Sequence, residues 1–517
     1  MILQRMCTWR KHVAIKPADN AAGAIMNKPG AGGVTRTDLR EGSLGLTGAI
    51  MQNVTHIAPA VAAFFFTATI VGFADAHSPL AYFLGLLIVL ALGMCLVQMA
   101  RLFPSAGGYF TYVSRTLHPR AGFLTGWAYT FYSPIITGPL IAFFGLILEG
   151  ELQANYNITF HWWVFTLIAI PVITLLAYFG VKLSVRAIVI LGGLEFLIVL
   201  ALGLSGLISP GPGGFSFRAF DPGFNPGGFA TAAGFALAIV FTVQGLTGWE
   251  AAVPLAEETK NPRRNVPIAT IASIAITGVM LVLVLWGQIV GWGTDQLSKL
   301  PGSSELPALV IAHRVWSGLW WIALLAMFSS VMAGSLACQN VATRMWYRMA
   351  RSGALPRVVG TVDRNRKTPI AAIGMQFVLS MVLGLVGGAL LQPDKLFILL
   401  VGYCVVIAVI IVYSLGNVGV VVYYWRHRRN EFNWLLHFVF PAGTTAVLIY
   451  SLIQSFRPFP ASPYNWSPVI IGVWMLLGIA ILVVLKMRGN EDWLLKAGDI
   501  IEERPDTADQ LMEMHKI

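Results

Sequence analysis

The stretch Phe241-Thr242-Val243-Gln244-Gly245-Leu246-Thr247-Gly248-Trp249-Glu250 places glycines and polar side chains inside a long apolar segment. A second stretch, Gln52-Asn53-Val54-Thr55-His56-Ile57-Ala58-Pro59-Ala60, packs polar residues into two turns and then adds a proline, which removes one backbone hydrogen bond. Interrupted backbone within lipid is tolerated only where protein or a water-filled cavity satisfies its polar groups. A pair of such segments therefore predicts a site near the bilayer midplane. For the segment around Pro59 alone, an ordinary kinked helix is the competing interpretation.

The composition around these segments is that of a membrane protein. Of the 517 residues, 56% are hydrophobic and only 11% are charged, whereas soluble domains are about one quarter charged. The apolar blocks recur evenly from Leu44 to Val484 without a polar domain between them. We predict an all-α integral membrane domain at 44–487, a polar N-terminal tail at 1–43 and an acidic C-terminal tail at 488–517.

Twelve apolar segments are long enough to cross a bilayer, which needs about 20 residues. The predicted spans are about 46–72, 79–101, 120–148, 161–180, 185–208, 229–256, 267–292, 316–349, 367–391, 394–425, 433–455 and 465–486. The interrupted spans are the first and the sixth, so each candidate repeat has five spans, and the odd number turns the second copy upside down. We therefore predict a 5+5 inverted repeat, with discontinuous helices 1 and 6, over about 46–208 and 229–425. The helices at 433–486 are additions to it.

The basic residues predict the orientation. With the N-terminus in the cytoplasm, the tails, the loops on that side and the adjoining ends of the spans hold 30 of the 35 lysines and arginines. Positive residues resist translocation, so both termini are expected on the cytoplasmic side of a multi-pass protein of the cell membrane. The net charge of +11 then reflects topology and contact with anionic lipid rather than nucleic-acid binding.

Three motifs resemble the amino acid–polyamine–organocation (APC) transporters. Glu250 through Pro267 resembles the end of their sixth span, Pro104 through Tyr109 their loop after the second span, and Arg344 through Pro356 the cytoplasmic end of their eighth span. The resemblance covers roughly 44–486. It implies a LeuT-type fold, alternating access, and amino acids, polyamines or related amines as solutes. Many members carry a Gly-Ser-Gly-like run at the first break, where this chain has Ile57 to Val61.

The breaks predict where the solute lies. A half-helix that follows a break presents unpaired N–H groups, and the half before it presents unpaired carbonyls, so a zwitterion can bridge the two. Trp249 would stack on the solute or close over it, although packing is the alternative. The resemblance to the APC transporters implies that Tyr129 lies near a position that lines their solute pocket. The predicted solute-binding residues are Thr55, His56, Ile57, Ala58, Pro59, Ala60, Tyr129, Ser133, Gly245, Leu246, Thr247, Gly248 and Trp249.

Two carboxylates within the spans are candidates for coupling transport to protons, because charged groups inside the membrane are costly. Glu250 follows the second break, in the expected first turn of the second half-helix. By resemblance it matches a proton-sensing glutamate, although it could simply offset the helix dipole. Glu195 falls by resemblance near a lysine of proton-coupled members; it is either a second protonation site or a neutral hydrogen-bonded acid. His56 is a pocket wall, a gate or a packing residue.

The absent motifs narrow the function further. The sequence has no phosphate-binding Walker loop, which argues against ATP-driven transport, and no Cys/His spacing typical of a metal site. We therefore expect a secondary active transporter, not an enzyme, with no cofactor. Proton coupling or exchange is expected, and sodium bound by Ser329 and Ser330 is an alternative. The expected partners are a small solute and the bilayer. A potassium transporter on the same fold, and a membrane sensor or enzyme that does not transport, remain as alternatives.

Overall fold

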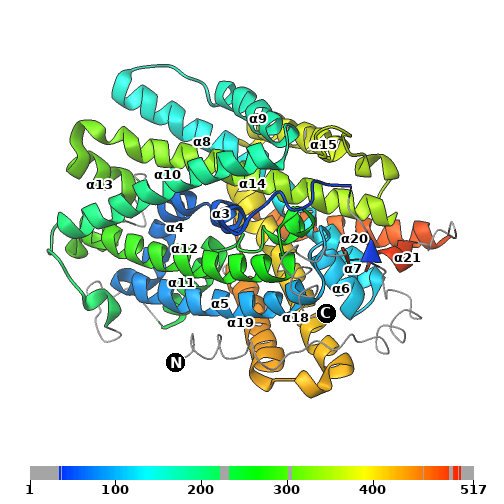
Figure 1. Cartoon of the computed structure of the whole chain (residues 1–517). Helices are drawn as coiled ribbons and strands as arrows, with labels where there is room; N and C mark the ends of the chain where they lie inside the picture. Colours follow the sequence, from blue (N-terminus) through cyan, green and yellow to red (C-terminus); the bar gives the residue numbers. More distant parts are fainter. Residues whose placement is uncertain are drawn as a thin grey trace, which may run out of the picture.

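The structure is a computed structural model that describes residues 34–35, 38–221, 232–300, 306–457, 459–487, 489, 493–498 and 500–501. Most of the two predicted tails and the predicted start of the sixth span at 229 lie outside these residues. Within the described residues the chain is almost entirely helical. Figure 1 shows long helices running across the molecule, from the end that carries α13 to the end that carries α21.

The first half of the chain forms helices over the first five predicted spans. Their bounds are α3 Leu46–Ile57, α4 Pro59–Ala74, α5 Ser78–Leu102, α6 Tyr109–Thr116, α7 Pro119–Tyr129, α8 Ser133–Tyr156, α9 Trp162–Tyr178 and α10 Val181–Ile208. Span 3 is interrupted between α7 and α8, which the sequence analysis did not predict. Pro134 at the start of α8 explains the interruption, because proline fits the first turn of a helix but not its interior.

The second half covers the remaining predicted spans. Its helices are α11 Ala232–Gly245, the 3₁₀ helix η4 Val253–Glu258, α12 Pro262–Trp292, α13 Pro307–Trp316, α14 Trp321–Ser352, α15 Ile370–Met381, α16 Gly388–Leu391, α17 Pro393–Phe397, α18 Val405–His427, α19 Phe440–Ser455, α20 Ser467–Met487 and α21 Trp493–Lys496. Three π-helical segments, η8 Val382–Gly387, η9 Ile398–Cys404 and η11 Leu435–Val439, complete the spans at 367–391, 394–425 and 433–455. Span 8 begins at Trp321 rather than at 316, because the chain turns at Ser317 after the separate helix α13.

Nine helices in the described residues are long and apolar enough to cross a membrane. One of them, Leu46–Leu102, contains α3, α4 and α5, and two shorter apolar helices lie at Trp162–Tyr178 and Gly234–Gly245. Large apolar side chains such as Leu197, Leu390 and Leu476 are more than 60% exposed. An aqueous surface does not normally carry so much exposed apolar area, so the protein is a multi-pass membrane protein.

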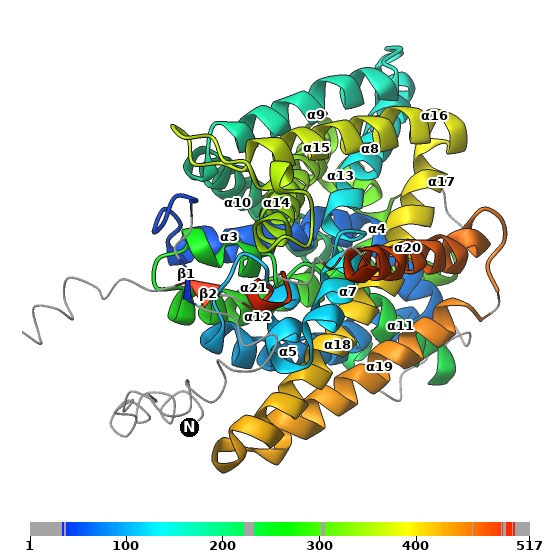
Figure 2. The same cartoon turned by 90° about the vertical axis from the view of Figure 1, so that its right-hand side faces the viewer.

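The helices of the two halves interleave. Contacts between the halves join α5 with α12, α8 with α14 and, along the upper edge in Figure 2, α9 with α15. In the same way, α3 contacts α12 and α11 contacts α5, while α10 contacts α14 and α18 contacts α7. Helices α19 and α20 lie toward the outside, against α18 and α7, in the view of Figure 2.

The described ends of the chain meet on one side of the molecule, here called the terminal face. Strand β1, Val34–Thr35, pairs in parallel with β2, Ile500–Ile501. Between β2 and the helices lies α21, whose Trp493 is 3% exposed and has its ring 5.8 Å from that of Phe123 in α7. Helix α13 lies on the opposite face (Figure 1).

Candidate functional site

The first helix break occupies a single residue. Helix α3 ends at Ile57, Ala58 has a left-handed backbone with φ 55°, and α4 begins at Pro59. Proline lacks an N–H and clashes with the preceding turn, so α3 cannot continue through it. The Ala58 N–H closes α3 by donating to the Thr55 carbonyl at 3.1 Å. The predicted discontinuity of helix 1 is therefore present as a sharp break.

The second break is longer. Helix α11 ends at Gly245, and η4 resumes only at Val253. Gly248 has φ 118°, and a Cβ atom there would lie 2.7 Å from the His56 carbonyl oxygen. Only glycine fits this backbone conformation and this close approach. The sequence analysis placed Glu250 in a first helical turn, which is wrong: it lies in the unwound segment, because Gly248 delays the return of helical geometry.

The two breaks touch each other. Gly248 lies against His56, and the Asn53 side chain of α3 accepts a hydrogen bond from the Ala252 N–H at 2.6 Å. Asn53 is fully buried. An unpaired buried N–H group costs about 1–3 kcal/mol, so Asn53 stabilises the unwound segment directly.

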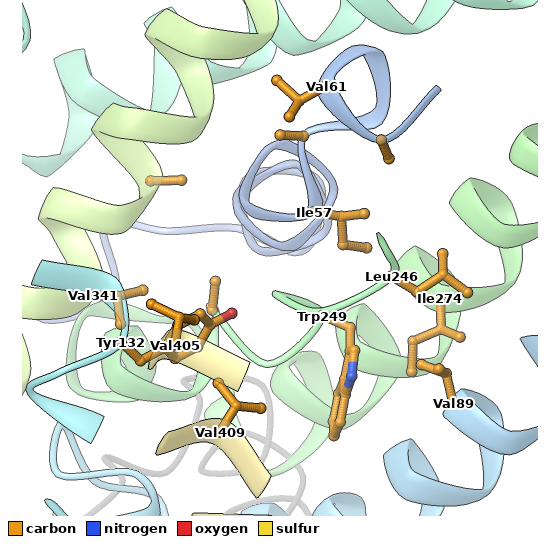
Figure 3. Close-up of a cluster of buried hydrophobic side chains, with 14 of the residues drawn as sticks. Ile57, Val61, Val89, Tyr132, Leu246, Trp249, Ile274, Val341, Val405 and Val409 are labelled. Atoms are coloured by element: carbon orange, nitrogen blue, oxygen red, sulfur yellow. The ribbon is translucent and has the colours of Figure 1, made fainter. Parts of the chain in front are cut away.

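A cavity opens where the breaks meet. Its wall includes Ile57 and Ala58 from the first break, Gln244 and Gly245 from the end of α11, and Trp249 from the second break. Aliphatic side chains of α18 and η9 form much of the remaining wall. Figure 3 labels six side chains of the cavity wall, from α3, α4, the turn before α8, the unwound segment and α18: Ile57, Val61, Tyr132, Trp249, Val405 and Val409. The cavity is apolar over most of its surface, with a few polar groups at the breaks.

The structure places the predicted solute-binding residues in two groups around this cavity. The first group lines it: His56, Ile57, Ala58, Gly245, Thr247 and Trp249. The second group consists of buried residues outside the lining: Thr55, Pro59, Ala60, Tyr129, Ser133, Leu246 and Gly248. Their contact with a solute stays a prediction.

His56 connects the first break to the third span. Its Nε2 atom lies 3.2 Å from the Ser133 hydroxyl and its Nδ1 atom lies 3.4 Å from the Tyr132 hydroxyl. The imidazole is 7% exposed and lines the cavity. His56 thus lines the cavity and also packs with satisfied hydrogen bonds, which are two of the three roles that the sequence left open. The third role, a gate, stays a prediction.

Glu250 is held by tyrosines from two other helices. The Tyr413 hydroxyl of α18 donates to Glu250 Oε2 at 2.8 Å, and the Tyr129 hydroxyl of α7 donates to Oε1 at 3.3 Å. Glu250 is 1% exposed, and it has no lysine or arginine partner within the described residues. Tyr413 lines the cavity, so Glu250 lies directly behind its wall.

Glu195 of α10 lies at the other break. Its Oε1 atom accepts hydrogen bonds from the Ala60 N–H at 3.4 Å and from the Ser330 hydroxyl at 3.0 Å. The same serine oxygen accepts from the Val61 N–H at 3.4 Å. The sequence predicted open N–H groups at the start of α4. Two side chains from α10 and α14 cover them instead, because both helices pack against α4.

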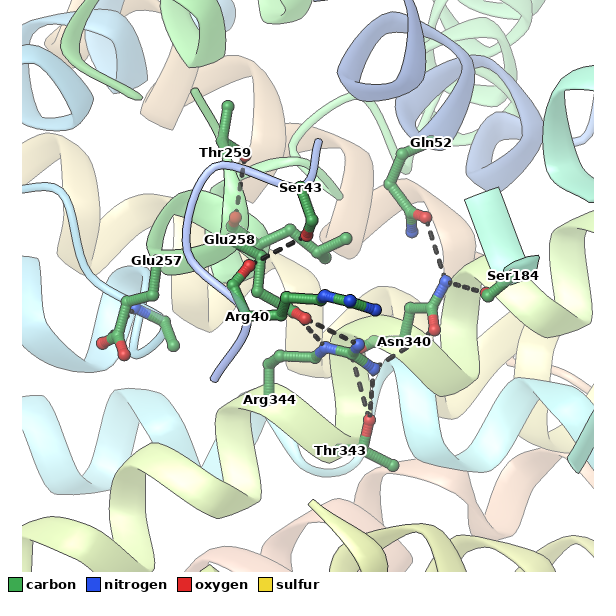
Figure 4. A network of polar contacts seen from close by, with 12 residues as sticks. Arg40, Ser43, Gln52, Ser184, Glu257, Glu258, Thr259, Asn340, Thr343 and Arg344 are labelled. Carbon is green, nitrogen blue, oxygen red and sulfur yellow. Dashed lines mark hydrogen bonds and ion pairs between the residues drawn. The ribbon is translucent and has the colours of Figure 1, made fainter. Parts of the chain in front are cut away.

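Other polar side chains close the cavity toward the terminal face. Arg344 Nε donates to Glu258 Oε2 at 2.8 Å, and both side chains are fully buried. Asn340 donates to Gln52 at 3.3 Å and to Ser184 at 2.7 Å (Figure 4). Arg344 lies six residues beyond the cavity residue Cys338 on α14, which is about 9 Å along a helix. Polar bonds between α3, α10, α14 and η4 therefore separate the cavity from this face.

Aromatic rings close the other side. Phe397 lines the cavity, whereas Phe65 and Phe143 line a second cavity together with Glu151 and His313. The ring of Phe143 lies 4.7 Å from Phe397 and 4.8 Å from Phe65. These three phenylalanines lie between the two cavities, and their contact is entirely apolar.

Sequence reasoning missed several residues of this site. Tyr413 lies in a mostly apolar span and gives no signal of its own. Tyr132 was only one aromatic among several in span 3, and Phe397 lay at the edge of a predicted span. Within the described residues, no group of three or more His, Cys, Asp or Glu side chains could hold a metal ion.

Comparison with known proteins identifies the family. Residues 48–494 match the family described as Amino acid permease. The chain belongs to the amino acid permease family. The family and its members to which this chain is similar are transporters rather than enzymes, and they fall within the APC superfamily that the three motifs resemble.

Individual permeases show the same likeness at low identity. The uncharacterized amino acid permease YecA of Bacillus subtilis strain 168 is 28% identical over 56% of this chain and 64% of its own length. The low-affinity putrescine importer PlaP of Escherichia coli strain K12 is 23% identical over 77% of this chain and 84% of its own. The aspartate-proton symporter of B. subtilis strain 168 is 24% identical over 58% of this chain and 59% of its own length. The chain thus matches slightly less than two thirds of the length of YecA.

Proposed function

We propose that this permease is a secondary active transporter for an amino acid, a polyamine or a related small amine. The observation that carries the proposal is the meeting of two broken helices at one cavity inside a membrane protein. Broken helices in contact with each other are typical of solute sites in secondary transporters. Putrescine and aspartate in the names of two relatives agree with this class of solute.

We further propose twelve spans arranged as a 5+5 inverted repeat with two additional helices. The contacts between helices support it, since a two-fold relation that exchanges spans 1–5 with spans 6–10 maps the observed pairs onto each other. The pairs α5–α12, α8–α14 and α9–α15 map onto themselves. The pair α3–α12 maps onto α11–α5, and α10–α14 maps onto α18–α7.

The protein would lie in the cell membrane with both termini in the cytoplasm. The excess of lysine and arginine on the terminal face supports this orientation, because positive residues are retained on the cytoplasmic side. Alternating access would then open the polar closure around Arg344 and Glu258 toward the cytoplasm. The aromatic closure at Phe65, Phe143 and Phe397 would open outward. In the present structure both closures are intact.

Proton coupling at Glu250 and Glu195 is the proposed energy source. Both are buried carboxylates beside a helix break, where a change of charge would alter the hydrogen bonds that hold the break. Within the part of the chain that the structure describes, the ionisable groups that face Glu250 are Tyr129, Tyr413, Tyr109, Tyr132 and Cys338, and none of them is basic. The second oxygen of Glu195 has no hydrogen-bond partner within the described residues, which leaves it open to a proton.

The test is transport by the full-length protein in proteoliposomes. Labelled amines and amino acids are offered with an inward proton gradient, with a sodium gradient, and with neither. We expect accumulation of at least one solute with the proton gradient. Potassium flux without any movement of amines or amino acids would replace the proposal by a cation transporter. Solute binding without movement would indicate a sensor. Accumulation only with sodium would reject the proton-coupled form.

Glu250→Gln tests the coupling step. The substitution keeps the shape and one acceptor oxygen, and its amide NH2 can donate to the other tyrosine. It removes the ionisable group, so transport should lose most of its dependence on pH between about 5 and 8. Glu151→Gln, at the second cavity, is the matched control and should retain the wild-type profile. An unchanged profile in Glu250→Gln would remove Glu250 from the coupling scheme.

A further inference from the structure

The four helix ends at the breaks do not face the cavity equally. The C-terminal end of α3 contributes Ile57 and Ala58 to the wall, and the C-terminal end of α11 contributes Gln244 and Gly245. The first residues of α4, Pro59 and Ala60, do not line it. C-terminal helix ends carry partial negative charge. The backbone therefore presents its negative ends to a solute.

The N–H groups at the first break are already bonded. The Ala58 N–H donates to Thr55, Pro59 has none, the Ala60 N–H donates to Glu195, and the Val61 N–H donates to Ser330. The next amide, Ala62, donates within the helix to the Ala58 carbonyl at 2.9 Å. A solute carboxylate has no free backbone donor in this stretch unless it displaces the Glu195 carboxylate.

Most amides of the second break are also bonded. Its amides Leu246, Thr247 and Ala251 donate to nearby carbonyls, and Ala252 donates to Asn53. The amides of Gly248 and Glu250 face the Glu250 carboxylate itself. Among the residues that the structure describes, no lysine or arginine lines the cavity. A carboxylate that entered this mostly apolar space would therefore lose most of its hydration and would find no lysine or arginine to neutralise its charge.

We infer that the solute is an organic amine with an apolar body and no free carboxylate beside its amine. This inference rests on the proposed transport function and narrows its solute class. Glu195 takes the place at the α4 N-terminus that the carboxylate of an α-amino acid would otherwise occupy. The ammonium group lies near the C-terminal ends of α3 and α11, in front of Tyr413 and Glu250. The aliphatic wall formed by α18 and η9 holds the body of the amine.

Matched pairs of compounds test the inference on the full-length wild-type protein. Each pair differs only in the carboxylate: isopentylamine and leucine, phenethylamine and phenylalanine, cadaverine and lysine. Binding is measured by ligand-induced thermal stabilisation and by competition for transport. We expect the amine of a bound pair to bind about tenfold tighter or more, since the amino acid buries an unpaired charge. Leucine methyl ester, which keeps the size but not the negative charge, should bind like isopentylamine.

Two substitutions separate the bonds of Glu195 from its charge. Glu195→Ala frees the Ala60 N–H and should narrow the preference for the amine to about threefold or less by improving amino acid binding. Glu195→Gln retains an oxygen that accepts from Ala60 and should keep the preference. An amino acid that binds wild-type protein as tightly as its amine overturns the inference but leaves the transport proposal intact. Failure of every amine and amino acid to bind or move overturns both.

Discussion

The break between α3 and α4 occupies one residue, whereas the break between α11 and η4 extends over Leu246–Ala252. The short break is made by a proline, and its open end is covered by Glu195 and Ser330 from α10 and α14. The long break depends on glycine and is held by side chains from α3, α7 and α18. Because the long break has isolated turn bonds rather than a continuous helix, it depends more on its neighbours.

This difference predicts that substitutions at the long break have the larger effects. The short break retains helical geometry on both sides of Ala58, so removal of one side chain leaves most of its backbone bonds intact. The long break has only isolated turn bonds over two turns, and side chains from three other helices hold it at Ala252 and Glu250. The four predictions below follow that order, from the backbone of the long break to the cap of the short one.

Gly248→Ala should have the largest effect on folding. The added Cβ would lie 2.6 Å from His56 Nδ1 and 2.7 Å from the His56 carbonyl oxygen, in a backbone conformation that alanine rarely adopts. We expect destabilisation of about 3 kcal/mol or more, measured by thermal unfolding in detergent. Gly193→Ala, where a Cβ meets nothing within 4 Å, is the control and should unfold like the wild type. Equal stability of the two variants would show that the breaks do not pack this tightly.

Asn53→Ala should have the second largest effect, because it removes the link between the breaks. The Ala252 N–H loses its partner at 2.6 Å and stays buried, which should cost about 2 kcal/mol of stability. Thr67→Val is the control, since the Thr67 hydroxyl bonds only to its own helix at Ala63. A smaller loss of stability in Asn53→Ala than in Thr67→Val would mean that Asn53 does not hold the unwound segment.

The positions of both breaks could be predicted from the sequence because their causes are local. Pro59 and Gly248 restrict or release the backbone at their own positions, whatever lies around them. The family and the helical class followed from motifs and composition in the same way, and the comparisons confirmed the family. Local signals also misled. The second half-helix was expected to contain Glu250 in its first turn, but helical geometry resumes only at Val253.

The partners of the breaks could not be predicted. Tyr413 reaches Glu250 from 163 residues away, and Ser330 reaches Glu195 from 135 residues away. Ser330 was considered only as a sodium ligand and Tyr413 not at all, because a tyrosine or a serine in a membrane helix usually packs or bonds locally. Only the packing of α18 and α14 against the breaks turns them into partners. That packing also explains why the N–H groups at α4, which the sequence predicted to be open, are covered.

Tyr413→Phe should impair transport more than Tyr129→Phe. Both tyrosines donate to Glu250, but the Tyr413 bond is 2.8 Å long and the Tyr129 bond is 3.3 Å long. We expect a loss of transport rate of about tenfold for Tyr413→Phe and about threefold for Tyr129→Phe. Initial uptake rates, normalised to folded protein, measure both. The reverse order would place the stronger constraint on Glu250 at α7 rather than α18.

Ser330→Ala, at the short break, should have the smallest effect. The substitution removes the acceptor of the Val61 N–H at 3.4 Å and a donor to Glu195 at 3.0 Å, while the Ala60 N–H still reaches Glu195. We expect a loss of about 1 kcal/mol in thermal unfolding. Ser114→Ala, which removes a bond within one helix, is the control for a lost buried hydroxyl. Because the proline maintains the short break without the serine, a loss larger than that of Asn53→Ala would reverse the proposed difference between the two breaks.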